Sequence, residues 1–242
     1  MEIVIDFERV RRLMREEHAQ AREEIRALGP IAAYARSQER LDARLHNAPD
    51  ASTLACKAGC SWCCHFTIDL RPVEVFRILD FVKANLDEAS RERIRAEIFA
   101  NRRITSLLDE TARMQMNIKC PFLVEGCCSI YEARPQTCRN YHATNAAGCQ
   151  RSFEEPENLD IDPEFAPLVY QIGGAHVEAF SRAMGEEGYD VAAYEMNTVL
   201  GAALEDASSA SAFENKQAPF AALEGEEVGE EFGGGGDDHP PA

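Results

Sequence analysis

The chain has 242 residues, of which 45% are apolar, enough for one domain with a hydrophobic core and some appended segments. Its formal net charge of −17 argues against nucleic acids and anionic membranes as partners, because Lys and Arg mediate binding to both. The sequence has no stretch of about 18 apolar residues and no basic, apolar leader, so we expect a soluble cytoplasmic protein.

Residues 1–50 are predicted to form the first unit, a pair of charged helices. Apolar side chains recur every three or four residues from Phe7 to Leu28, stop at Gly29-Pro30, and resume as far as Leu45. The first 50 residues contain 9 basic and 10 acidic side chains. This balance is typical of two salt-bridged helices that form either a solvated packing hairpin or a surface for a protein partner.

Residues 51–206 are predicted to form the second unit, a metal-binding domain with supporting helices. Apolar side chains recur at helical intervals from residue 71 to 117, with a break near residues 87–90, and two more helices are expected at about 163–184 and 190–205. Between residues 71 and 117 the apolar positions, all expected to face the core, are Val75, Ile78, Leu79, Phe81, Val82, Leu86, Ile94, Ile98, Leu107 and Leu108. Residues 118–160 lack this periodicity and are rich in Cys, Gly, Pro and Asn, as in chains that fold around a metal.

Residues 207–242 are predicted to be a disordered acidic tail. They contain eight acidic side chains and one Lys, and therefore contribute −7 of the total charge. A segment of this composition is not expected to bury enough apolar surface to fold. The predicted fold is therefore mainly α, with helices around an irregular cysteine-rich metal-binding subdomain and a disordered C-terminal tail.

Nine cysteines carry the functional signal of the sequence. Disulfides are the alternative, but the count is odd and the chain has no export signal, so we interpret these residues as thiolate ligands. The first group consists of Cys56, Cys60, Cys63 and Cys64, whose spacing would place all four on one face of a helix. Four ionised thiols on one small surface repel one another, which favours a cation between them.

The second group is more widely spaced and consists of Cys120, Cys127, Cys128, Cys138 and Cys149. One tetrahedral zinc site uses four ligands, so eight or nine cysteines favour two metals or a cluster with bridging thiolates. Thiolates suit zinc and iron–sulfur clusters alike, and ligand type does not distinguish them. The expected cofactor is zinc or iron, including an iron–sulfur cluster.

Several other residues near the cysteines are candidates for secondary roles. Arg134 and Arg139 are expected to balance thiolate charge, while Lys57 and Lys119 fit this role and ordinary surface solubility equally well. His65 and His142 are candidates for a further ligand or a proton carrier, although an ordinary exposed histidine is the more frequent case. Glu74 fits a helix N-terminus beside Pro72 better than an iron ligand.

The combined cysteine motifs resemble a known family. The pattern C-x3-C-x2-C-C, followed by C-P-F-L, C-S-I-Y-E-x-R-P-x-x-C-R and a last cysteine, is similar to the YkgJ-type cysteine-cluster family (CxxCxxCC), whose members are described as zinc- or iron-chelating proteins. The resemblance spans Cys56 to Cys149 and implies eight metal ligands: Cys56, Cys60, Cys63, Cys64, Cys120, Cys128, Cys138 and Cys149. Cys127 departs from the family pattern. Family resemblance implies metal binding and leaves the reaction, if any, open.

An iron-dependent enzyme is the alternative function. Some longer relatives resemble flagellin lysine N-methylases, and this resemblance implies redox or group-transfer chemistry at an iron–sulfur or non-haem iron centre as the alternative. The run Cys56 to Cys63 is also similar to the three-cysteine signature of radical-SAM enzymes, but the chain lacks the alternating strands and helices of their barrel. Nucleophilic cysteine catalysis needs one activated thiolate beside a histidine, which a crowd of thiols does not provide.

Overall fold

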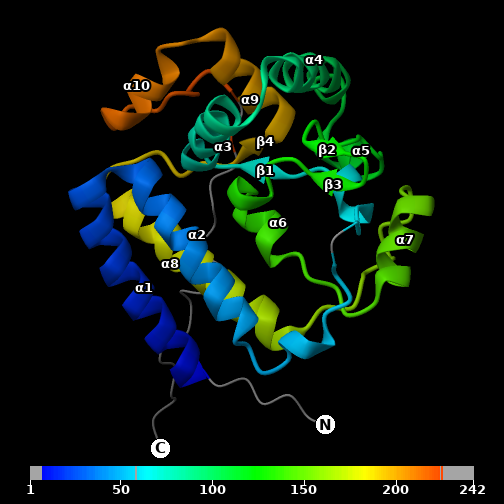
Figure 1. Cartoon of the computed structure of the whole chain (residues 1–242), viewed down its shortest axis with the longest axis horizontal. Coiled ribbons are helices and arrows are strands. Elements are labelled where there is room, and N and C mark those ends of the chain that lie inside the picture. Colours follow the sequence, from blue (N-terminus) through cyan, green and yellow to red (C-terminus); the bar gives the residue numbers. More distant parts are fainter. Residues whose placement is uncertain (1–6, 58, 224, 226–242) are drawn as a thin grey trace, which may run out of the picture.

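Helices account for most of the regular structure in this computed structural model, which describes residues 7–57, 59–223 and 225. Ten α-helices and four two-residue strands lie within those ranges (Figure 1). The prediction of a mainly α fold is confirmed. The strands form two short antiparallel pairs, unlike the βα barrel that radical-SAM chemistry would need. No helix in these described ranges has both the length and the apolar character needed to cross a membrane.

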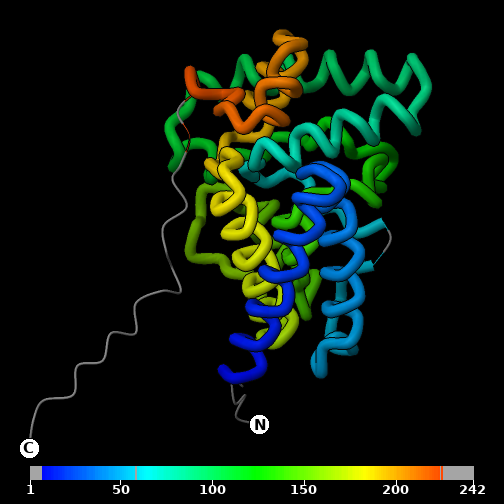
Figure 2. The backbone as a smooth tube through the Cα atoms, turned by 90° about the vertical axis from the view of Figure 1, so that its left-hand side faces the viewer, coloured from blue at the N-terminus to red at the C-terminus, as the bar shows by residue number. Residues whose placement is uncertain are grey.

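The N-terminal helices form a hairpin that packs along one long helix from the C-terminal half. Helices α1 (Phe7–Leu28) and α2 (Pro30–His46) lie beside α8 (Pro167–Glu186), and Figure 2 shows the three running side by side. The connection is the single residue Gly29, whose φ of +83° is strained for any residue with a Cβ. Pro30 then starts α2 at a position where no backbone N–H is needed. The predicted break at Gly29-Pro30 is confirmed.

A buried polar network joins these three helices. Glu17 is fully buried and accepts hydrogen bonds from Ser37 (2.9 Å), Arg40 (2.7 and 2.9 Å) and Arg44 (2.7 Å). His176 of α8 is also fully buried, with Nε2 2.8 Å from the Ser37 hydroxyl and Nδ1 accepting from Arg44. Many of the charges that suggested a partner surface thus pair within the chain, and a protein partner on the outer face of the hairpin stays a prediction.

This network predicts acid sensitivity of the fold. Burial, with the help of Arg44 and Arg40, lowers the pKa of His176 to about 4, so the folded state keeps the imidazole neutral. In the unfolded chain this histidine binds a proton near pH 6.5. The contribution of neutral His176 to the free energy of unfolding is therefore complete above that pH and is lost as the pH falls towards 4. A shift of this size corresponds to roughly 3 kcal/mol. Burial raises the pKa of Glu17, but Arg40, His176 and Arg44 together lower it by more, so the net shift is downward. Protonation of Glu17 at still lower pH therefore also reduces the stability of the fold.

The matched variant for that prediction is His176→Gln, because a glutamine can accept from Arg44 and donate to Ser37 without titrating. Urea unfolding of both proteins between pH 7.5 and 4.5, at equal metal loading, should give a steeper decline for the parent chain. Parallel curves for the two proteins would mean that His176 does not govern the acid response.

Four further helices form a second layer above the hairpin. They are α3 (Pro72–Asn85), α4 (Glu88–Thr105), α9 (Met196–Glu205) and α10 (Ser209–Glu214). The break between α3 and α4 is confirmed, because Asp87 caps α4 by accepting a hydrogen bond from the Ser90 N–H at 2.7 Å. One predicted core position is wrong: Leu107 is 84% exposed, since α4 ends at Thr105 and Leu107 lies in the turn beyond it. Strand β1 (Asp69–Leu70) pairs with β4 (Tyr194–Glu195) at the base of this layer.

The predicted start of the C-terminal tail at residue 207 is wrong in this structure. Residues 209–214 form α10, and Phe213 and Phe220 are 0% and 3% exposed within the main core. Both rings pack on Phe76 of α3, at centroid distances of 5.3 and 5.8 Å. Aromatic burial therefore fixes this segment despite its polar, small-residue composition. Residues 226–242, which the tail prediction also covers, lie outside the described residues.

The cysteine-rich region is built from short elements on one side of the two helical layers (Figure 1). These are η1 (Ala51–Thr53), η2 (Trp62–His65), α5 (Glu110–Met114), β2 (Leu123–Val124), β3 (Cys127–Cys128), η3 (Tyr131–Ala133), α6 (Gln136–Asn140) and α7 (Ala146–Glu154). The first cysteine group does not share one face of an α-helix: only residues 62–65 are helical, and they form a single 3₁₀ turn. Backbone turns, rather than helix periodicity, bring its members together.

Candidate metal centre

The η2 turn holds the first cysteine group against the chain that carries the second. Its last two residues bind the segment before Cys120 through backbone hydrogen bonds, from Cys120 N–H to the Cys64 carbonyl (2.8 Å) and from Ile118 N–H to the His65 carbonyl (2.9 Å). On the opposite flank, Trp62 and His65 pack on Phe153 of α7, with centroids 5.3 and 4.8 Å apart. The 3₁₀ turn therefore lies between Cys120 on one side and the helix of Cys149 on the other.

A tight hairpin positions Cys127 and Cys128. Strands β2 and β3 pair Leu123 with Cys128, and the connection passes through Gly126 at a φ of +78°. A Cβ added to Gly126 would lie 3.9 Å from the carbonyl oxygen of Gly59, which itself has a φ of +85°. The loops of the two cysteine groups are thus neighbours, and the positive φ angles of Gly59 and Gly126, rather than a lack of space, favour glycine at both positions.

Cys138 is held by the most rigid part of the region. It lies on α6, whose first N–H, that of Gln136, donates to the buried carboxylate of Glu74 at 2.9 Å. The same carboxylate accepts from the Tyr34 hydroxyl and from the Arg71 N–H, each at 2.9 Å. Glu74 therefore ties α2, α3 and α6 together and forms the reciprocal cap of α3, which confirms its predicted helix-terminal role.

Four thiols converge at the inner end of the region, next to Glu74. Burial, followed by the nearby thiols of Cys64 and Cys128, raises the pKa of the Cys138 thiol to about 12. Burial likewise raises the pKa of Cys120 well above its usual value, and the adjacent Cys138, Cys64 and Cys128 raise it further. The thiols of Cys64 and Cys128 therefore act on both Cys120 and Cys138, which places these four side chains in one desolvated part of the region.

A second set of thiols surrounds the loop that leads into α7. Burial raises the pKa of Cys149 to about 11, with further contributions from Cys56 and Cys60. The Cys56 thiol lies 3.9 Å from the Ala143 carbonyl, and the Ala55 N–H donates to that same carbonyl at 2.9 Å. Tyr141 borders this set, because burial and then the thiols of Cys149 and Cys63 raise the pKa of its hydroxyl.

The adjacent Cys63 and Cys64 connect the two sets. Cys63 donates a hydrogen bond to the Cys64 sulfur, which lowers the pKa of Cys64 to about 7 and raises that of Cys63. Arg134 favours the Cys64 thiolate as well. Within this vicinal pair, ionisation of Cys64 is therefore favoured over that of Cys63.

Arg134 is the cation that faces the thiols. It lowers the pKa of Cys56, Cys64, Cys128 and Cys138, in each case against a larger effect of burial or of a neighbouring thiol. Its guanidinium lies 4.1 Å above the ring of Tyr131, and its Nε is buried without a hydrogen-bond partner in the described part of the chain. This placement agrees with the predicted charge-balancing role.

Unlike that of Arg134, the side chains of Arg139 and Lys119 pair mainly with groups other than the thiols. Arg139 is 2% exposed, pairs with Asp42, and donates to the carbonyls of Glu132 and Arg134 at 2.5 and 3.1 Å, so its main contacts fix the loop around α6. Lys119 lies 3.7 Å from Glu97 on the surface. Both observations favour a structural interpretation of these two cations over direct contact with the thiols.

The two candidate histidines also differ. Nδ1 of His65 lies 3.2 Å from the Ser61 carbonyl oxygen, so this nitrogen is engaged within its own turn. Nδ1 of His142 is buried without a hydrogen-bond partner among the described residues, and burial together with Arg134 lowers its pKa. His142 therefore remains the better candidate for a further ligand, and its role stays a prediction.

The chemistry of this region fits a thiophilic metal, although the thiols do not stand in ligand geometry. In the described part of the chain, no three His, Cys, Asp or Glu side chains are spaced to hold a metal ion, and all nine cysteines are free thiols. Buried polar atoms without a partner are concentrated here, with six of the eleven such residues in the described ranges lying between residues 117 and 142. They are Asn117, Ser129, Arg134, Gln136, Asn140 and His142. Convergent soft donors beside unsatisfied polar groups fit a site that a metal would complete.

Comparison with known families supports the interpretation of this region. Residues 55–161 match a family model named CxxCxxCC and described as a putative zinc- or iron-chelating domain. The cysteine-rich region is therefore similar to that family. The match includes all nine cysteines, and the resemblance inferred from the motifs is confirmed. The family description supports metal binding, with zinc or iron as the metal. No curated protein and no solved structure matches the chain.

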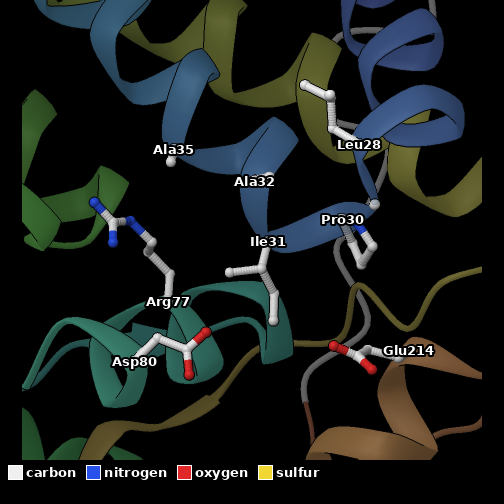
Figure 3. Close-up of a pocket in the computed structure, with 9 residues that line it drawn as sticks. Leu28, Pro30, Ile31, Ala32, Ala35, Arg77, Asp80 and Glu214 are labelled. Atoms are coloured by element: carbon white, nitrogen blue, oxygen red, sulfur yellow. The ribbon is translucent and has the colours of Figure 1, made fainter. Parts of the chain in front are cut away.

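Two pockets of the structure lie away from the cysteine thiols. One, of about 310 Å³, opens at the start of α2 and is lined by Ile31, Arg77, Asp80 and Glu214 among others (Figure 3). The other, of about 270 Å³, lies near Arg113 and Tyr194. Neither is lined by a cysteine, so neither offers a substrate cavity that opens onto the proposed metal ligands.

The sequence did not reveal the close contact between α8 and the C-terminal end of α6. A Cβ added to Gly173 of α8 would lie 1.7 Å from Oδ1 of Asn140, two residues after Cys138, whereas a Cβ on Gly174 would meet nothing within 4 Å. The adjacent glycines therefore differ: only Gly173 is required for close packing. A Gly-Gly pair inside a helix indicates close packing, but it does not identify the segment that packs there.

Replacing Gly173 by Ala should displace Asn140 and the end of α6, and so weaken metal retention and lower the melting temperature by an amount equivalent to about 1–3 kcal/mol. Gly174→Ala is the matched control, and it should be neutral or stabilising by up to about 1 kcal/mol, because alanine is the better helix former. Equal behaviour of the two variants in thermal unfolding and metal analysis would contradict the proposed role of the Gly173 contact.

Proposed function

We propose that this protein chelates zinc or iron in the cytoplasm through a cluster of eight thiolates. The proposed ligands are Cys56, Cys60, Cys63, Cys64, Cys120, Cys128, Cys138 and Cys149. The observation that carries the proposal is the convergence of these thiols from four separate segments onto one region, which is the region matched by the CxxCxxCC model. Thiolate is the form that binds the metal, so the raised thiol pKa values mean that metal binding would release protons.

A bound metal would contribute much of the folding stability of this region. Within residues 118–160 of the structure the elements are short and several buried polar atoms lack a partner, although Phe122 and Ile130 reach the main core. Structural metal sites contribute on the order of 10 kcal/mol to small domains. A structural or metal-handling role follows directly from this arrangement.

An iron–sulfur or non-haem iron enzyme is the second candidate. It is favoured by the excess of thiols over the needs of one zinc ion, because iron–sulfur clusters also take four cysteines each. His142, with its buried and unpartnered Nδ1, would then be available for proton transfer or ligation. Redox or group-transfer chemistry of the kind found in flagellin lysine N-methylases would be the class to test.

Metal removal tests the first candidate. Chelation should expose residues 120–149 to proteolysis, while the α1–α2 hairpin, which is buried against α8 through apolar and ionic contacts, should stay resistant. Mass spectrometry of limited digests with and without the chelator gives the comparison within one molecule. Unchanged resistance of both segments would mean that the cysteine region folds without metal.

A further inference from the structure

We propose that the eight ligands divide into two four-cysteine metal sites, with the division falling between the adjacent Cys63 and Cys64. This inference rests on the proposed function. The inner site would comprise Cys64, Cys120, Cys128 and Cys138. The outer site would comprise Cys56, Cys60, Cys63 and Cys149. Each set has the ligand number and softness of a tetrahedral zinc site or of a four-cysteine iron–sulfur cluster.

The geometry of η2 provides the division. In a 3₁₀ turn successive residues are rotated by about 120°, so adjacent Cys63 and Cys64 are poorly placed to bind the same ion in tetrahedral geometry, although their thiols interact with each other in this structure. One flank of the turn is bonded to the Cys120 segment through the Cys64 carbonyl, at 2.8 Å. The other flank packs on α7 through Phe153, four residues after Cys149.

The segments that deliver the other ligands follow the same division. Leu123 connects Cys120 to Cys128, because its N–H donates to the Cys120 carbonyl at 3.0 Å and its strand position pairs with Cys128. On the outer side, the Ala143 carbonyl accepts the Ala55 N–H at 2.9 Å and contacts the Cys56 thiol, which joins the first cysteine to the loop before α7. Local backbone contacts therefore link Cys64, Cys120 and Cys128 on the inner side and tie Cys56 to the loop before α7 on the outer side.

Cobalt(II) titration combined with thiol alkylation tests the division without any mutation. Cobalt is added to the reduced, metal-free full-length chain, and the cysteines that each addition protects are identified by mass spectrometry. The cysteines should become protected from alkylation in two sets of four, with Cys63 and Cys64 in different sets. Binding should saturate near two cobalt ions per chain. Sets that mix inner and outer cysteines, or protection of all eight in a single step, would overturn the division. Absence of cobalt binding would overturn the proposed function itself.

Paired variants give the second readout. The double variant Cys120→Ser/Cys138→Ser should lose about one cobalt and keep protection of the outer four cysteines, and Cys56→Ser/Cys149→Ser should do the reverse. Cys127→Ser, outside both sets, is the control and should bind as much cobalt as the parent chain. Loss of both metals in both double variants, with helical circular dichroism retained, would mean that the thiolates form one shared cluster.

Discussion

A chain that ends after Asp206 is expected to be unfolded or to melt far below the full-length protein. It would lose α10 together with Phe213 and Phe220, which are almost completely buried against Phe76. Truncating one buried phenylalanine to alanine costs about 3–5 kcal/mol, so losing two approaches the total stability of a typical domain, about 5–15 kcal/mol. The truncation therefore removes side chains of the main core, and its effect should be larger than the removal of a solvent-exposed tail.

Two matched proteins separate the core effect from the effect of acidic charge. A chain that ends after Gly225 keeps both rings and should melt within about 2 °C of the full-length protein, because the composition of residues 226–242 provides no apolar core. Full-length Phe213→Ala should lose about 3–5 kcal/mol in urea unfolding. A protein truncated after Asp206 that melts like the parent chain would show that α10 contributes nothing to the fold.

Replacement of Cys128 by Ser is expected to remove one metal per chain and destabilise the cysteine region. Cys128 is half-buried, packs against the main core, and lies close enough to Cys64 for the two thiols to affect each other's ionisation. The loss of one of four ligands opens the coordination shell of the metal and weakens its binding, and with it the contribution of the metal to folding.

The neighbouring residue supplies the control. Cys127 is exposed on the opposite face of strand β3, so Cys127→Ser should retain both the metal-to-protein ratio and the melting temperature. Equal losses in the two variants would mean that nine cysteines contribute to the site. A loss confined to Cys127→Ser would move the ligand register by one residue.

Local sequence signals predicted the boundaries of the helical layers well. Gly29-Pro30 ends α1 and starts α2, and Asp87 caps α4, because glycine, proline and capping residues act through the backbone of their own segment. Glu17 carried an overlooked signal, since it falls on the apolar stripe between Met14 and Ala21, where a charge is buried only if it is paired. Its partners on α2 and α8 could not be named from the sequence, because they are distant along the chain.

Tertiary contacts account for the predictions that failed. Phe213 and Phe220 stand in a polar, small-residue segment, and only their fit against Phe76 gives them a place in the core. Leu107 continues the apolar period of α4, but the helix ends before it. The cysteine spacing suggested a helical face, whereas turns at Gly59 and Gly126 and a 3₁₀ turn arrange the thiols instead. In that region the motifs predicted the chemistry but not the geometry.

The central claim is tested most directly by elemental analysis and an absorption spectrum of the full-length protein, purified without oxygen from cells supplied with zinc and iron. About two metal equivalents per chain are expected, colourless if the metal is zinc and with visible thiolate charge-transfer bands if it is iron. More iron than that, with acid-labile sulfide, would identify iron–sulfur clusters on the same thiolates. A folded protein that carries neither metal, and that takes up neither when its reduced thiols are offered both, would contradict the account.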